Sequence, residues 1–255
     1  MVRSRLRGAL LQIGMTLAVV AVLVGLLLAS PYRWNFKALL PYRALYWNGL
    51  WLTIQASALA FLIGMFLGVW VGIARGSRNP IVRQLATLYV ETIRGTPFLV
   101  QVSIAYFGIA VLINFNNKFW VGTVALGVFA AAYIGEILRA GIESLDPGQR
   151  EAARSLGLNR AQTMRAIILP QAVRRMIPPL TSELISLTKE SSLLYTIGLM
   201  ELMEAARRVG SATFRQFEAF LIAALIYLSL TVPLSILARR LEDRLARGER
   251  KGVHL

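Results

Sequence analysis

Several charged side chains occur within stretches that are otherwise apolar enough to lie in a membrane. Glu91 and Arg94 are three residues apart, and Lys189 and Glu190 are adjacent and followed by Ser191. An ionised group at the centre of a bilayer costs roughly 2.5–3.5 kcal/mol on insertion scales, so each needs a partner or a function. A cation, an anion and hydroxyl groups could together hold a zwitterionic amino acid. We therefore predict a substrate site that contains Glu91, Arg94, Thr96, Lys189, Glu190 and Ser191.

The same spacing allows a simpler interpretation. Residues i and i+3 are neighbours on a helix surface, so Glu91 and Arg94 could form an ion pair with each other. In the substrate-binding interpretation, Lys189 or Arg94 holds the carboxylate of the amino acid, and Glu91 holds its ammonium group. The sequence leaves both interpretations open.

The residues Gly95, Thr96 and Pro97 predict a helix break beside Arg94. A glycine gives flexibility, a threonine is a common N-cap and a proline suits the first turn of a new helix. A helix that starts inside the membrane carries roughly +0.5 of a charge and free N–H groups, which suit a carboxylate. A break at that depth must be buried or line a water-filled cavity.

Several other kinds of chemistry are excluded by the residues available. The chain has no cysteine and one histidine, His254, so it offers no thiolate and no histidine metal site. It has no HExxH or GxSxG motif for hydrolysis and no GxxxxGK[ST] loop for ATP phosphates. We therefore predict no catalytic residue, no metal and no cofactor in this chain, which is not itself an enzyme.

The apolar residues form six runs that predict an all-α, polytopic membrane protein. The chain has 255 residues, of which 56% are hydrophobic, and its mean hydropathy is +0.58. About 20 helical residues cross the ~30 Å hydrocarbon core. The first run could be a secretory signal, but it is longer than a signal core and lacks a clear cleavage site, so we expect an uncleaved span. The runs cover approximately residues 9–30, 48–74, 84–113, 119–138, 176–198 and 217–238.

The basic residues indicate how these spans are oriented. The net charge is +15, and most of the 28 Lys and Arg lie before Arg7, in 75–83, in 139–175 and after Arg239. With six spans all four segments lie on one side, which the positive-inside rule makes the cytoplasm. Both termini are then cytoplasmic, and the basicity reports topology in the bilayer and not a nucleic-acid partner.

The segment 146–171 looks like a structured insert between two spans. Asp146, Pro147 and Gln149 are an N-cap, a first-turn proline and a capping-box partner, and Gly157 can end the helix in a left-handed conformation. Asn159 with Gln162 repeats the start signal for a second helix, which Pro170 is expected to end. Two capped helices are more structure than a connector needs, so we predict a protein-docking role.

These residues carry a resemblance to a known family. Glu151, Ala152, Ala153, Leu156, Gly157 and the "LPQ" of 169–171 resemble the "EAA" coupling loop of ABC importer permeases. The stretches "NGLWLTI", "VETIRGTPFLVQ", "YIGEILRAGIESLDPGQ" and "LTKESSLLYTIG" resemble the branch that imports polar amino acids such as histidine, glutamine, glutamate and arginine. The resemblance covers approximately residues 48–240. Relatives often carry Asp where this chain has Glu190.

The resemblance implies a type I importer fold with five core transmembrane helices, here preceded by one additional N-terminal helix. It implies a cytoplasmic coupling helix that sits in a groove of a separate ATPase, where Glu151 contacts that partner and Gly157 turns the chain. We assign coupling to Arg150, Glu151, Ala152, Ala153, Leu156 and Gly157. The implied organisation is an N-terminal segment of residues 1–47, a transport domain of residues 48–240 and a charged cytoplasmic tail of residues 241–255.

The implied partners are a dimer of ATPases that holds ATP and Mg, a second permease chain, identical or sister, and an extracytoplasmic amino-acid-binding protein. The implied location is the bacterial cytoplasmic (inner) membrane. The main alternative is a gradient-driven secondary amino-acid transporter, which also uses broken helices and buried charges. Such a transporter would not need a capped docking loop, and the sequence lacks the two-fold symmetry that those folds often show.

Two further patterns concern helix packing. Gly64, Gly68 and Gly72 form GxxxGxxxG, a face that another helix can approach closely, either in the same chain or in a second permease. The spacing of Glu136, Arg139 and Glu143 predicts ion pairs that support the coupling loop. We assign no role to Glu183.

Overall fold

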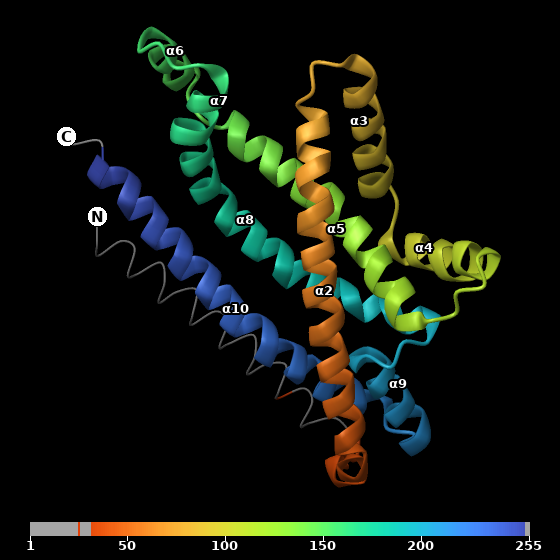
Figure 1. Cartoon of the computed structure of the whole chain (residues 1–255). Helices are drawn as coiled ribbons and strands as arrows, with labels where there is room; N and C mark the ends of the chain where they lie inside the picture. The colour runs from red at the N-terminus through yellow and green to blue at the C-terminus, as the bar shows by residue number, and fades with distance from the viewer. Residues whose placement is uncertain (1–24, 26–31, 253–255) are drawn as a thin grey trace. The chain divides into compact units, whose positions relative to one another are not determined.

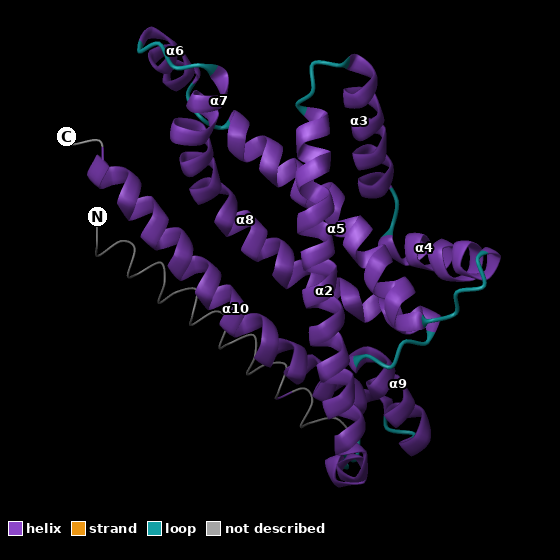
Figure 2. Ribbon diagram, in the orientation of Figure 1, coloured by secondary structure: helices purple, strands orange, loops and turns teal. Residues whose placement is uncertain are grey.

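The computed structural model describes residue 25 and residues 32–252, with side chains as far as Glu242, and every regular element among these residues is helical (Figures 1 and 2). The chain divides into two compact units, Met1–Ala38 and Leu39–Leu255. Except for the helical Gly25, the predicted first span at 9–30 lies outside the described residues. In the first unit, Trp34 packs edge-on against Tyr32 and stacks on Phe36.

The described elements follow the predicted runs closely. They are η1 (Phe36–Tyr42), α2 (Arg43–Arg75), α3 (Pro80–Gly95), α4 (Phe98–Ser103), η2 (Ile104–Ala110), α5 (Lys118–Glu143), α6 (Pro147–Ser155), α7 (Arg160–Thr163), η3 (Met164–Ile168), α8 (Leu169–Glu190), η4 (Ser191–Ile197), α9 (Leu202–Thr213) and α10 (Gln216–Gly252). Of the irregular helices, η1 and η4 are 3₁₀-helices and η2 and η3 are π-helices.

Three described helices, Phe36–Arg75, Lys118–Glu143 and Gln216–Glu242, are long and apolar enough to cross a membrane. The pair Pro80–Gly95 and Phe98–Ala110 makes a fourth span if its two halves, bent by 103°, are counted as one. α8 is not among them, because it carries several charged residues: Arg174, Arg175, Glu183, Lys189 and Glu190. The number of five core spans therefore stays a prediction.

The glycines of α2 pack against α5 of the same chain, and this is the most extensive contact between two helices in the described residues (Figure 1). A Cβ atom on Gly64 would lie 2.6 Å from the Cβ of Ala130, and one on Gly68 would lie 2.8 Å from Ile134. Gly72 faces the carbonyl of Gly135. Close approach without side chains lets two membrane helices gain dispersion contacts along their length.

The prediction that Pro170 ends the second helix of the insert is wrong. α7 passes through the π-helix η3 directly into α8, in which Pro170 occupies the first turn. Because α7, η3 and α8 are contiguous, Pro170 lies inside a longer helix, where its missing N–H removes one backbone hydrogen bond. The wider π-turn bonds the N–H of Leu169 to the carbonyl of Met164, so the helix continues without a stop.

Gly64→Ala tests the contact between α2 and α5. The added methyl group would collide with Ala130, so we expect a loss of roughly 1–3 kcal/mol in stability from overpacking. Thermal unfolding of the purified chain in detergent measures it. The matched control is Gly108→Ala, where a Cβ would meet nothing nearer than 3.9 Å. Equal melting temperatures for the two variants would show that the close approach is not required.

Candidate substrate pathway and coupling surface

The side chain of Gln101 bridges the break between α3 and α4. Pro97 has no N–H, so it cannot bond the carbonyl of Ile93 four residues earlier. The Nε2 of Gln101 donates to that carbonyl over 2.7 Å, and to the carbonyl and hydroxyl of Thr96 over 3.0 and 2.9 Å. Gln101 thus supplies a donor to two carbonyls at the break, those of Ile93 and Thr96. It stands within a motif quoted above, but the sequence reasoning gave it no role.

The prediction that Thr96 caps the new helix is wrong. Pro97 occupies the N-cap position of α4, and no side chain caps it. The Thr96 hydroxyl instead donates to the carbonyl of Thr92 over 2.9 Å, one turn back in α3. The backbone is extended at Thr96 and Pro97, so the chain changes direction there. The Thr96 hydroxyl therefore points back to α3 and not forward to α4.

Two of the predicted substrate ligands lie exposed on α3. Arg94 extends over the ring of Tyr133 on α5, with 5.3 Å between the guanidinium carbon and the ring centroid. Such a contact stabilises the cation without neutralising it. Glu91 is exposed, and the described residues contain no ion pair between it and Arg94. Both charges are therefore available to a polar ligand.

The other predicted ligands lie where α8 ends and η4 begins. Lys189 is exposed and Glu190 is half-buried. Ser191 is fully buried, and its hydroxyl donates to the carbonyl of Thr188 over 2.9 Å. In this conformation Ser191 caps the helix end, and no described hydrogen bond or ion pair links residues 189–191 to residues 91–96.

The coupling segment begins at a capped turn. The Asp146 carboxylate accepts a hydrogen bond from the N–H of Gly148 over 2.8 Å, and Pro147 starts α6. The predicted capping box with Gln149 is not formed, because the Gln149 N–H bonds to the backbone carbonyl of Asp146 instead. Gly157 has φ +79°, the left-handed conformation expected of a glycine that ends a helix.

The second cap of this segment is a complete capping box. Asn159 accepts from the N–H of Gln162 over 3.0 Å, and the Gln162 side chain accepts from the N–H of Asn159 over 2.9 Å. The two caps set the residues at which α6 and α7 begin, and Gly157 turns the chain between them.

The assigned coupling residues divide into exposed and buried positions. Arg150, Glu151 and Ala152 are exposed, and Leu156 is 78% exposed although it is apolar. Ala153 is buried and faces the rest of the chain. α6 therefore presents a charged and apolar surface that the described residues leave uncovered.

Ion pairs tie the base of this segment to the spans. Arg139 pairs with both Glu136 and Glu143, as the spacing predicted, and Glu136 also pairs with Arg75 at the end of α2. Arg175 of α8 donates to the carbonyl of Ser144 over 2.6 Å. These contacts join α2, α5 and α8 beside the residues that precede α6.

Three buried glutamates that sequence reasoning missed lie at α9 and the start of α10: Glu201, Glu204 and Glu218. Glu201 caps α9 by accepting from the N–H groups of Met203 and Glu204, and it also accepts from the Tyr227 hydroxyl of α10 over 2.9 Å. Glu201 stands at the N-cap of α9, where Ser, Thr, Asp and Asn are the preferred residues, so no standard cap signal marked it in the sequence.

The second of these glutamates is held by two arginines of its own helix. Arg207 and Arg208 both bond the carboxylate of Glu204, and the hydrogen bond from Arg207 lowers the pKa of Glu204 more than burial raises it. A charged carboxylate is thereby kept at the junction of α9 with its neighbours. The arrangement is structural, and no group of acidic or histidine residues among those described could hold a metal ion.

The chain is similar in sequence to known membrane transport proteins. Residues 64–247 match the family of binding-protein-dependent transport system inner membrane components. The chain is 37% identical to the arginine transport system permease protein ArtQ of Bacillus subtilis over 83% of this chain and 97% of the relative. It is 40% identical to the probable glutamine ABC transporter permease protein GlnM of the same organism, over 84% of this chain and 99% of the relative.

Solved structures agree with the fold. A chain from the crystal structure of an amino acid ABC transporter with histidines superposes with a TM-score of 0.79 at 37% identity, over 84% of this chain and 100% of that one. A chain of the inward-facing MetNI methionine ABC transporter superposes with a TM-score of 0.70 at 19% identity, over 80% and 98% of the two chains. The second likeness concerns the fold alone.

Gln101→Leu tests the support of the broken span. Removing the donor leaves the Ile93 carbonyl without a partner, so we expect a loss of roughly 1–3 kcal/mol. The melting temperature of the purified chain measures it. Ser103→Ala is the control, because that hydroxyl only adds a bond to the Leu99 carbonyl within a helical stretch. An unchanged melting temperature in Gln101→Leu would contradict the assignment.

Proposed function

Because the chain belongs to the family of binding-protein-dependent transport system inner membrane components, we propose that it is the permease subunit of an ATP-driven importer of polar amino acids. The observation that carries this proposal is the near full-length similarity to permeases named for arginine and glutamine transport. A gradient-driven secondary transporter has no support among these relatives. ATP hydrolysis belongs to a separate ATPase subunit of such a system.

The substrate pathway follows from the charges that the described residues leave without ion pairs. Glu91 and Arg94 lie beside the break in the α3–α4 span, and Lys189 lies at the end of α8. Charges at membrane depth are costly unless they face water or a partner. A zwitterionic amino acid offers a partner for each sign, with its ammonium group at Glu91 and its carboxylate at Arg94 or Lys189.

The α6 surface is the proposed contact with the ATPase. Glu151 and Arg150 supply charge, Leu156 supplies an exposed apolar side chain and Gly157 turns the chain behind them. ATP binding would close a dimer of ATPases, and the coupling segment would carry that movement into α2, α5 and α8. Transport then proceeds by alternating access between two conformations.

The assembly that this function requires includes two permease chains, identical or sister, and an extracytoplasmic amino-acid-binding protein. We expect ATP and magnesium to bind the ATPase subunits and not this chain. The positive-inside rule favours a cytoplasmic position for the coupling segment and both termini in a bacterial cell. The exposed α6 surface then lies on the side where ATP is available.

Glu151→Lys tests the coupling surface. Reversing the charge at the centre of an exposed docking helix should remove the ATPase from a pull-down in mild detergent, while the amount of permease in the membrane stays unchanged. Glu242→Lys is the matched control, because it makes the same change at an exposed position of α10. ATPase retained equally by wild type and by Glu151→Lys would count against this contact.

Glu91→Gln tests the substrate pathway. Loss of the negative charge should lower the uptake of both amino acids, which share the ammonium group proposed to bind Glu91, and that of arginine about tenfold more, because only arginine brings a second cation to the site. Uptake of each labelled amino acid by the reconstituted complex measures both effects. Glu242→Gln controls for the change of charge, and unchanged uptake of both amino acids in Glu91→Gln would remove this residue from the site.

A further inference from the structure

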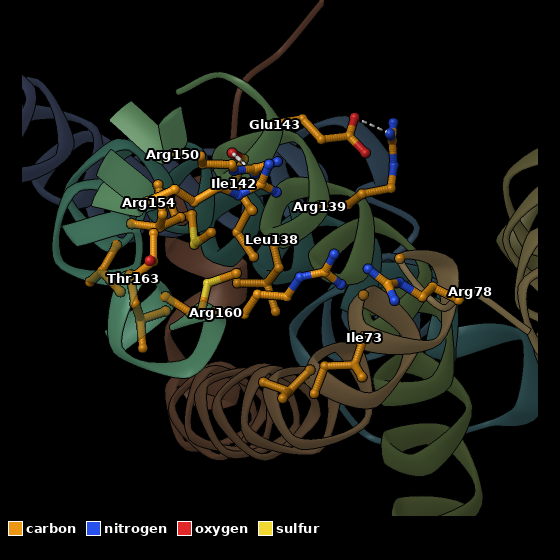
Figure 3. A pocket seen from close by; sticks show the side chains of 18 residues that line it. Ile73, Arg78, Leu138, Arg139, Ile142, Glu143, Arg150, Arg154, Arg160 and Thr163 are labelled. Carbon is orange, nitrogen blue, oxygen red and sulfur yellow. Dashed lines mark hydrogen bonds and ion pairs between the residues drawn. The ribbon is translucent and has the colours of Figure 1, made fainter. Parts of the chain in front are cut away.

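A cavity of about 930 Å³ opens beside the coupling segment, and no described residue fills it (Figure 3). Its walls come from the end of α2, the end of α5 and the start of α8, and α6, α7 and η3 complete it. All of these segments carry the basic residues that mark the cytoplasmic side. The cavity therefore lies at the level where the spans leave the cytoplasmic leaflet.

The membrane side of the cavity is apolar. Ile73 of α2 and Leu138 and Ile142 of α5 face Met164 of η3 and Leu169 and Val173 of α8. Several of these side chains remain open: Ile73 is 62% exposed, Leu169 is 43% exposed and Val173 is 44% exposed. Apolar surface left open at this depth is favourably covered by hydrocarbon.

The cytoplasmic side of the same cavity is strongly basic. Its charged lining residues are Arg78, Arg139, Arg150, Arg154, Arg160 and a single carboxylate, Glu143 (Figure 3). Glu143 is already paired with Arg139. Among the described residues, Arg78, Arg154 and Arg160 have no ion-pair partner, so three guanidinium groups from three different segments line the cavity without a paired carboxylate.

We propose that this cavity binds an anionic phospholipid of the cytoplasmic leaflet, with an acyl chain against the apolar wall and the phosphate among the arginines. A guanidinium group can donate two parallel hydrogen bonds to the oxygens of one phosphate. Basic pockets at the cytoplasmic ends of membrane helices bind anionic lipid headgroups. A free phosphate or a nucleotide would leave the apolar wall uncovered. A neutral lipid would leave the arginines unpaired.

The position of the site gives the lipid a mechanical role. Its lining residues belong both to the coupling segment and to the spans that α6 must move, so an occupied cavity joins the two. The proposal goes beyond the transport function and does not depend on which amino acid is carried. It concerns the lipid requirement of the coupling segment.

Lipid retention by the purified complex tests the proposal. We would titrate the complex with phosphatidylglycerol or phosphatidylcholine and measure the bound lipid by native mass spectrometry. Phosphatidylglycerol should bind at least tenfold more tightly, and Arg78→Gln with Arg160→Gln should weaken it roughly ten- to thirty-fold. The matched control is Arg83→Gln with Arg174→Gln, which removes two exposed arginines outside the cavity. Equal binding of the two lipids, or equal losses in both double variants, would overturn the proposal.

A second measurement identifies the occupant directly. A photo-reactive residue in place of Ile73 reports what lies against the apolar wall of the assembled complex in its membrane. A covalent adduct with the mass of an anionic phospholipid is expected, and excess inorganic phosphate should not prevent it. A cross-link to a second permease chain or to an ATPase would overturn the proposal, as would adducts with neutral lipid alone.

Discussion

The structure depends on one constraint of the bilayer: a backbone group without a partner is too costly to leave in hydrocarbon. The span formed by α3 and α4 bends by 103° at Pro97. The Ile93 carbonyl, to which Pro97 cannot donate a hydrogen bond, accepts one from the Gln101 side chain instead. The bend leaves Arg94 and Glu91 beside it, where charged groups without ion pairs can meet a ligand. The hydrogen bonds of Gln101 thus stabilise the bend beside which we propose the substrate pathway.

A rigid frame connects that pathway to the coupling segment. The glycines of α2 allow close contact between α2 and α5, and the ion pairs of Glu136 and Arg139 join the ends of these two helices that lie nearest the segment 146–171. α8 begins at Leu169, in the last residues of the segment 146–171, and ends at Lys189 and Glu190, so one helix reaches from that segment to the proposed substrate site. Movement of α6 therefore has a direct route into the membrane.

The sequence predicted the elements whose signals are local. Apolar runs located the spans, and Asp146, Gly157 and the Asn159–Gln162 box located the turns of the coupling segment, because caps depend on residues a few positions apart. It failed where a distant or unusual partner decides the outcome. A π-turn carries the helix past Pro170, Gln101 reaches back across the break, and Glu201 is buried against Tyr227 of another helix. The same limit applies to the substrate site, because no local sequence pattern shows whether residues 91–96 lie near residues 189–191.

The central claim is that this permease works in an ATP-driven importer. The most direct test is uptake of labelled arginine and glutamine by proteoliposomes that contain the purified permease with its ATPase and binding protein. The account predicts uptake that requires hydrolysable ATP and the binding protein, and that persists when proton and sodium gradients are abolished. Uptake driven by an ion gradient in the absence of ATP would contradict it.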